Sequence, residues 1–228
     1  MRLGLLSDIH GNAAALRVAL INSKCEKFVV CGDIVGYYYE VKEVLSLLSQ
    51  VDFSFVRGNH EVMLANLRID ASLGESITKK YGSSALIALS QLTPTELDFL
   101  CASKDSETLK YNGVSINLSH GSPWKIDEYL YPDSEKSKWL EFLNYKEHVF
   151  IVGNTHHQLI KRFHGKLIIN PGSIGQSRSD PGMAQWAEFD TENLAVTFKS
   201  VPYDISSVLS SCKEIDPDNY SLQKALYP

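Results

Sequence analysis

The fold is decided by the N-terminal stretch Arg2-Leu3-Gly4-Leu5-Leu6-Ser7-Asp8-Ile9-His10-Gly11-Asn12. Residues 2–6 form a short apolar run that ends at a Gly-Asn turn, a pattern typical of a buried parallel strand. Side chains two positions apart on an extended chain lie on the same side, so Asp8 and His10 are expected to point together. A carboxylate and an imidazole placed in this way can bind one divalent metal ion. Taken alone, the pair more often marks a polar turn in which Asp8 and Asn12 bond to the backbone.

The composition is typical of a globular protein. At 228 residues and 44% hydrophobic content, the chain can bury a substantial core, and we expect one domain over residues 1–228. The net charge of -5 offers no basic surface for nucleic acid, which disfavours specific binding of duplex DNA and an exonuclease function. The apolar runs are too short to span a membrane. The four cysteines form no Cys-x-x-Cys pair, which favours a cytoplasmic location.

Strand and helix patterns alternate through the first quarter of the chain. Apolar runs at residues 2–6, 27–31 and 51–56 predict three strands. Helical spacing connects them at residues 13–21 and 40–50, and in the first helix we expect Ala14, Ala15, Val18 and Ile21 to share the buried face. An order of β-α-β-α-β predicts a parallel sheet.

Hairpin signals dominate the remainder. Asn112-Gly113, His164-Gly165 and residues 190–193 predict turns between antiparallel strands, and residues 148–152 form another apolar run. Helices are expected at residues 61–90, with an interruption near 70–74, and at 94–101, after the capping box Thr93-Pro94-Thr95-Glu96. A third is expected at residues 134–146, with Trp139, Leu140 and Leu143 buried. The last is expected at residues 203–226, with a break at Asp216-Pro217. Parallel units followed by hairpins pack most simply as two sheets face to face, with helices outside.

Polar side chains follow the strands at their carboxyl ends, where open α/β sheets carry their sites. Oxygen and imidazole donors recur there, and none is a thiol: Asp8, His10, Asp33, Asn59, His60, His120, Asn154 and His156. This donor set suits manganese, iron, zinc or magnesium and not a closed structural zinc site. Each residue alone is explained by a turn or a strand cap, whereas their common placement predicts a metal centre.

In this order the motifs resemble those of the calcineurin-like metallophosphoesterases, especially small bacterial and archaeal phosphodiesterases. The resemblance is carried by Asp8-Ile9-His10, Gly32-Asp33, Gly58-Asn59-His60-Glu61, Ser119-His120-Gly121 and Gly153-Asn154-Thr155-His156, followed by Asn170-Pro171-Gly172-Ser173. It implies an α/β fold, a four-layer α/β/β/α sandwich of two mixed sheets, in agreement with the order of elements above.

The resemblance also implies two divalent metal ions, with Mn²⁺ expected first and Fe, Zn or Mg as alternatives. The first ion would be bound by Asp8, His10, Asp33 and His156, and the second by Asp33, Asn59, His120 and Asn154. The shared Asp33 carboxylate fits the need for an anion between two cations. A hydroxide between the ions would attack the phosphoester, and His60 would be the general acid.

Asn154 departs from the family pattern, which usually has a histidine there. An amide oxygen is a weaker donor than an imidazole, so we expect a weaker second site that favours manganese or magnesium over zinc. His157 is an alternative ligand, but adjacent strand residues point to opposite faces. We expect His148 and His164 to lie at the surface.

Two further features bear on the substrate. Tyr37-Tyr38-Tyr39 either packs into the core or stacks on an aromatic group of the substrate. Arg178 either binds a phosphate or is a solvated loop residue.

We therefore expect a metal-dependent phosphoesterase acting on small phosphodiesters, phosphomonoesters or nucleotides. The alternative is an inactive scaffold that binds other proteins through the same fold, as a retromer subunit does. A retained His60 favours the enzyme, since a scaffold needs no general acid.

Overall fold

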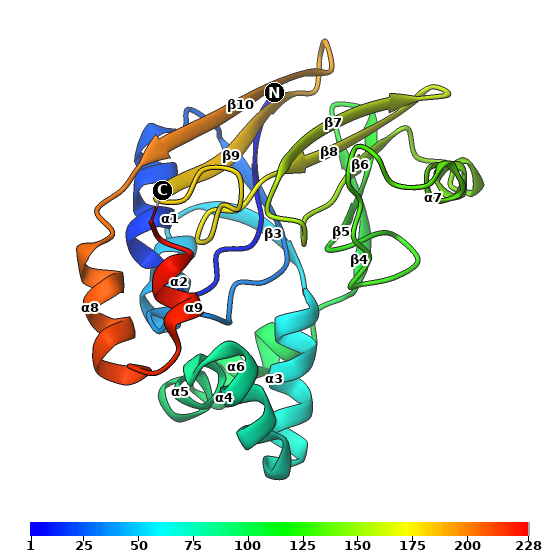
Figure 1. Ribbon diagram of the computed structural model, residues 1–228. Helices are drawn as coiled ribbons and strands as arrows, with labels where there is room; N and C mark the ends of the chain where they lie inside the picture. The colour runs from blue at the N-terminus through cyan, green and yellow to red at the C-terminus, as the bar shows by residue number, and fades with distance from the viewer. Residues whose placement is uncertain (228) are drawn as a thin grey trace.

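Two five-stranded sheets pack face to face in the computed structural model, which describes residues 1–227 (Figure 1). The strand order is β10-β9-β1-β2-β3 in the first sheet and β4-β5-β6-β8-β7 in the second. Both sheets contain parallel and antiparallel neighbours, so both are mixed.

The first sheet is built on the predicted β-α-β-α-β unit. Its parallel strands are β1 (Arg2–Leu6), β2 (Lys27–Cys31) and β3 (Asp52–Val56), and the antiparallel β9 (Met183–Asp190) and β10 (Ala195–Pro202) extend it beyond β1. Helices α1 (Ala13–Asn22) and α2 (Val41–Leu48) connect the parallel strands. Buried residues of these helices, such as Leu16 and Val44, pack against Leu6 and Val30 on one face of this sheet.

The second sheet contains β4 (Ser106–Tyr111), β5 (Val114–Ser119), β6 (Val149–Ile151), β7 (Gln158–Phe163) and β8 (Lys166–Pro171). Its hairpins turn at Asn112-Gly113 and His164-Gly165, where all the φ angles are positive, as tight hairpin turns require. Helix α7 (Lys136–Glu141) and a 3₁₀ turn (Phe142–Asn144) cover its outer face, with Trp139 and Phe142 against Phe150.

Four layers result. Leu3, Leu5 and Val29 from the first sheet meet Ile116 and Ile151 from the second in an apolar core between the sheets. Separate cores lie under the helices on either side. The predicted α/β/β/α sandwich is therefore confirmed.

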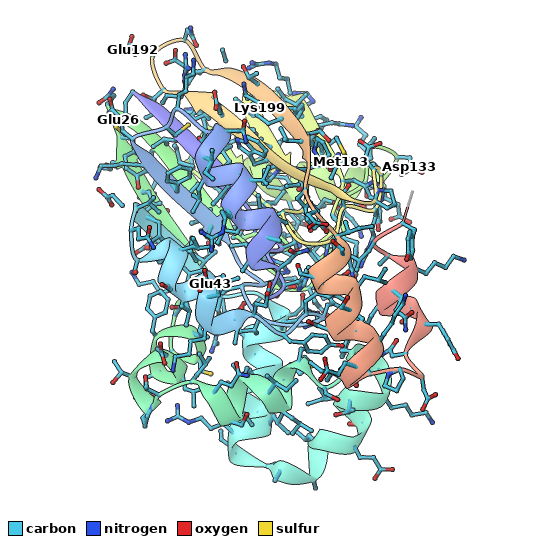
Figure 2. All side chains as sticks on the ribbon, turned by 90° about the vertical axis from the view of Figure 1, so that its left-hand side faces the viewer. Glu26, Glu43, Asp133, Met183, Glu192 and Lys199 are labelled. Atoms are coloured by element: carbon cyan, nitrogen blue, oxygen red, sulfur yellow. The ribbon has the colours of Figure 1, made fainter. Side chains whose placement is uncertain are left out.

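A helical segment and a C-terminal segment complete the chain. Helices α3 (Asn59–Ile69), α4 (Gly74–Tyr81), α5 (Ser84–Gln91) and α6 (Pro94–Cys101), with a 3₁₀ turn (Ala71–Leu73), gather at one end of the molecule (Figure 1). Glu192, in the β9–β10 turn, marks the opposite end (Figure 2). Helices α8 (Ser206–Ile215) and α9 (Tyr220–Lys224) are separated at the predicted Asp216-Pro217 break. Among residues 1–227 no helix combines the length and the apolar character that a membrane crossing needs.

Three side chains predicted to be buried are exposed. Ile21 is 75% exposed, because the buried face of α1 contains Ala15 and Ala19 and Ile21 lies about 200° around the helix from Ala19. Leu140 and Leu143 are 43% and 41% exposed. The expected helix over residues 134–146 is shorter, and its change to 3₁₀ geometry after Glu141 turns Leu143 away from Trp139, which is buried.

Candidate metal centre

Loops from both sheets meet at the carboxyl ends of β1, β2, β3, β5 and β6. They bring together three groups of acidic and imidazole side chains whose possible ligand atoms lie within 4.8 Å of one another. The groups are Asp8–His10–His156, His10–Asp33–His60 and Asp8–Asp33–His120, and every member is buried. Residues separated by almost 150 positions in the sequence therefore share one site.

The backbone at the centre is not extended, contrary to the reasoning that placed Asp8 and His10 on one side of a strand. Strand β1 ends at Leu6, and Asp8 and His10 have φ angles of 54° and 52°. Asp33, Asn154 and His156 are also left-handed, with φ angles of 55°, 65° and 59°. Such conformations cost on the order of 1–3 kcal/mol each in non-glycine residues. They are held by bonds between loops, such as His10 N–H to the Asp33 carbonyl at 2.9 Å.

Three imidazoles are anchored in the same way. Nδ1 lies 3.0 Å from the Val35 carbonyl in His10, 2.5 Å from the Cys31 carbonyl in His120, and 2.7 Å from the Gln176 carbonyl in His156. A carbonyl can only accept, so each Nδ1 donates a proton to it, and each Nε2 is the nitrogen that remains to bind a metal ion. Anchoring of the distal nitrogen is the usual arrangement of histidines that bind metals.

The three Nε2 atoms converge on two carboxylates. Asp33 Oδ2 lies 3.2 Å from His120 Nε2 and 3.9 Å from His10 Nε2, and Asp8 Oδ1 lies 3.2 Å from His156 Nε2. Asp8 Oδ1 is buried and has no hydrogen-bond partner within residues 1–227. The Nε2 atoms of His10 and His156 are only 3.1 Å apart. Two lone pairs and an unpartnered carboxylate oxygen at these distances fit a divalent cation between them.

Electrostatics at the centre favour ionised carboxylates. Burial alone would raise the pKa of Asp33, but His120 and His60 outweigh it and lower that pKa to about 2. Burial likewise opposes the charge on His120, yet Asp33 and Asp8 raise the pKa of His120 to about 10. Without a metal ion, His120 is therefore the cation that balances Asp33, and a bound metal ion would replace its proton.

His60 differs from the other three imidazoles. Its Nε2 lies 4.0 Å from Asp33 Oδ2, while its Nδ1 is buried without a hydrogen-bond partner in the described chain. Burial lowers the pKa of His60. Gly36 packs against the ring so closely that a Cβ there would lie 2.2 Å from Nδ1. No carbonyl holds His60 in the tautomer of a metal ligand, which leaves it free to exchange a proton.

The two predicted amide ligands are also at the centre. Asn59 Oδ1 lies 3.0 Å from His120 Nε2. The Asn154 backbone N–H donates to Asp8 Oδ2 at 3.1 Å, and its Nδ2 donates to the Glu128 carbonyl at 3.1 Å. His157 is not in any of the three groups and packs instead beside Tyr131, with ring centroids 5.9 Å apart. We expected His157 not to be a ligand, because adjacent residues of a strand point to opposite faces. The reason differs, since residues 153–157 form a loop and not a strand.

Glu61 is a residue whose role the sequence did not reveal. Its carboxylate accepts backbone N–H groups from Asp33 at 2.8 Å, Val35 at 3.0 Å and Gly58 at 2.7 Å. It thereby ties the loop after β2 to the loop after β3. Burial and the Asp33 charge raise the pKa of Glu61 to about 7, even though these N–H groups oppose the shift. Its position three residues after Gly58, at the start of a helix, is the signal that could have identified it.

The three tyrosines differ in burial. Tyr38 and Tyr39 are buried, and the Tyr39 hydroxyl donates to Asp216 at 2.8 Å. Tyr37 is half-buried, and its ring lies 4.5 Å from that of His10. Arg178 is exposed and makes no ion pair within residues 1–227; its backbone N–H donates to the His156 carbonyl at 3.3 Å. His148 and His164 are exposed, as expected.

Comparison with known proteins agrees with this geometry. A family model described as the calcineurin-like phosphoesterase superfamily domain matches residues 1–193. An uncharacterised protein of Methanocaldococcus jannaschii is 29% identical over an alignment 225 positions long, and the alignment covers 89% of this chain and 88% of the relative.

Solved structures share the fold. A metallophosphoesterase from Sphaerobacter thermophilus superposes with a TM-score of 0.80 at 24% identity, covering 99% of this chain and 98% of that chain. An archaeal phosphodiesterase superposes with a TM-score of 0.53 at 18% identity, covering 88% of this chain and 100% of that chain. The chain belongs to the calcineurin-like phosphoesterase superfamily. This family is metal-dependent, and the Asp and His groups described above could bind metal.

Proposed function

We propose that the protein is a metal-dependent phosphoesterase that hydrolyses small phosphodiesters, phosphomonoesters or nucleotides. The observation that carries this proposal is the difference among the histidines. His10, His120 and His156 are anchored through Nδ1 with Nε2 toward the carboxylates, whereas His60 beside them is not. A site with ligand imidazoles and one separate imidazole has the parts that hydrolysis of a phosphoester needs.

The proposed ligands follow the two sets that the resemblance to the family implies. Asp8, His10, Asp33 and His156 would hold one ion, and Asp33, Asn59, His120 and Asn154 the other, with Mn²⁺ as the expected metal. When bound, the metal ions supply Lewis acidity and an activated water. The proximity of Asp33 Oδ2 to both His10 and His120 supports its place between the two sets.

His60 is the proposed general acid. In a complex with substrate, its imidazolium would donate a proton to the oxygen of the leaving group, and proton transfer of this kind contributes typically ~10²–10⁴-fold to the rate. Arg178 would neutralise a phosphoryl oxygen, because its guanidinium is a cation near the centre with no acidic partner in the described chain. The proposed location is the cytoplasm, in keeping with four cysteines that are all free thiols.

Metal analysis of the purified protein, paired with hydrolysis of aryl phosphate mono- and diesters, tests the proposal. Activity should vanish after chelation and return with manganese. Asp33→Asn should lose metal and activity together. Asp52→Asn should keep both, because Asp52 is an exposed residue of β3 that pairs with Lys27. Full activity of Asp33→Asn would refute the two-ion assignment. Absence of turnover with every metal tested would refute the enzymatic function and favour a scaffold.

A further inference from the structure

Two tyrosines pack against the ring of His60, and one of them, Tyr37, also contacts the ring of His10. The Tyr37 and Tyr81 rings each lie 4.9 Å from the His60 ring, and 5.8 Å from one another. Tyr37 comes from the loop after β2 and Tyr81 from the last turn of α4. Both are only half-buried, so each tyrosine keeps part of its surface accessible.

One side chain of the C-terminal segment bonds to residues that are close in sequence to both tyrosines. Asp216, between α8 and α9, accepts the Ser83 N–H at 2.8 Å, the Ser83 hydroxyl at 2.6 Å and the Tyr39 hydroxyl at 2.8 Å. Ser83 is two residues after Tyr81, and Tyr39 is two residues after Tyr37.

Gly82 allows the Asp216 carboxylate to approach the end of α4 closely. Gly82, between Tyr81 and Ser83, has a φ of 82°, and a Cβ there would lie 2.8 Å from Asp216 Oδ2. The carboxylate therefore sits directly against the end of α4. Residues 206–226 lie beyond the part of the chain that the family model matches, which ends at residue 193.

We propose that Tyr37 and Tyr81 bind an aromatic leaving group of the substrate, a nucleobase-like or aryl ring, and that Asp216 is the positioning residue for this aromatic pair. This inference rests on the proposed function, because it assumes that the phosphoester is bound with its leaving group toward His60. An acid must contact the leaving oxygen, so the rest of the leaving group lies beside the acid. The surfaces available there are two tyrosine rings, which favour an aromatic group over an aliphatic one.

Binding of inert phosphonates tests the inference without turnover. Phenylphosphonate and methylphosphonate carry the same anionic head, and only the first has a ring at the position of the leaving group. Calorimetric titration of the manganese-loaded protein should give phenylphosphonate about tenfold tighter binding, as expected for one aromatic contact. Equal affinities in the wild-type protein would overturn the inference, even if hydrolysis assays support the proposed function.

Substitution of each tyrosine tests whether Tyr37 and Tyr81 cause the preference for phenylphosphonate. Tyr37→Leu and Tyr81→Leu should each reduce the ratio of the two affinities several-fold while methylphosphonate binds as before. In hydrolysis, the same variants should raise KM for a phenyl ester several-fold more than KM for a fluoroalkyl ester of similar leaving-group acidity. Retention of the full preference in both variants would show that the ring is bound elsewhere.

Variants of Asp216 test its positioning role. Asp216→Ala should lose the phenyl preference but not methylphosphonate binding. Asp216→Asn should largely restore it, because one amide oxygen can still accept from both Ser83 N–H and Tyr39. Asp218→Ala, an exposed neighbour, serves as control. If Asp216→Ala does not fold, Tyr39→Phe, which removes a single hydrogen bond, should still weaken the preference. An unchanged ratio in Asp216→Ala, or in Tyr39→Phe where that variant is needed, would refute the positioning role.

Discussion

Replacement of Glu61 should destabilise the protein and disturb the metal centre together. Its fully buried carboxylate satisfies three backbone N–H groups on two different loops. Glu61→Ala leaves all three buried donors without a partner, at about 1–3 kcal/mol each. The free energy of unfolding should therefore fall by at least about 3 kcal/mol, which lowers Tm by at least about 6 °C for a chain of this length.

Glu61→Gln separates shape from charge. One amide oxygen can accept the N–H groups of Asp33 and Gly58, which now share Oε2, but the amide NH₂ then faces the Val35 N–H. The buried Val35 N–H left without an acceptor should destabilise the fold by about 1–3 kcal/mol. The expected order of Tm is wild type, then Gln, then Ala.

Thermal unfolding followed by circular dichroism, with and without manganese, measures these shifts, and calorimetric titration measures metal affinity. Glu96→Gln is the matched control, because Glu96 occupies the same position in the first turn of α6 but caps only Thr93, far from the centre. It should change Tm by less than about 3 °C and leave metal affinity unaltered. A Glu61→Ala variant that resembles this control in both measurements would refute the proposed role of Glu61.

Three further predictions concern the centre. Gly36→Ala should displace the His60 ring, because the new Cβ would lie 2.2 Å from its Nδ1. Turnover should fall about 10²–10⁴-fold while the metal content stays the same. Loss of metal in this variant would contradict a role of His60 as acid only. In chelated protein the pKa of His120 is raised to about 10, so its pairing with Asp33 stabilises the fold fully below pH about 6.5 and is lost as pH rises through 10. Tm should fall and manganese affinity should rise between pH 7 and 9, and an affinity independent of pH would refute the competition. Asn154→His should tighten the second metal, and titration calorimetry without a stronger site would count against that assignment.

The strands and the members of the centre could be predicted because their signals are local. Arg2–Leu6 and Lys27–Cys31 are apolar runs ended by polar turns, and the structure has strands with these bounds. The ends of parallel strands meet at one edge of a sheet, so Asp8 and Asp33 were expected near each other before any distance was known.

Other features depend on contacts that no local pattern encodes. The left-handed backbone at Asp8 and His10 follows from bonds to the neighbouring loop and not from their own propensities. Tyr81 reaches His60 only because of how the helical segment packs, and Asp216 bonds to Ser83 across 133 positions of sequence. The exposure of Ile21 likewise depends on which turn of α1 faces the sheet.

The proposed ligands come from both sheets, and this affects the stability of the protein in the cell. Asp8, Asp33 and Asn59 follow strands of the first sheet, whereas His120 and His156 follow strands of the second. Under the proposed assignment, bound ions cross-link the two sheets, and the sheets cannot separate until the ions leave. Metal at a hundred times its dissociation constant would add about 2.7 kcal/mol to the free energy of unfolding. Scarcity of manganese would then lower not only the activity of each molecule but also its resistance to proteases, so that abundance falls together with metal supply.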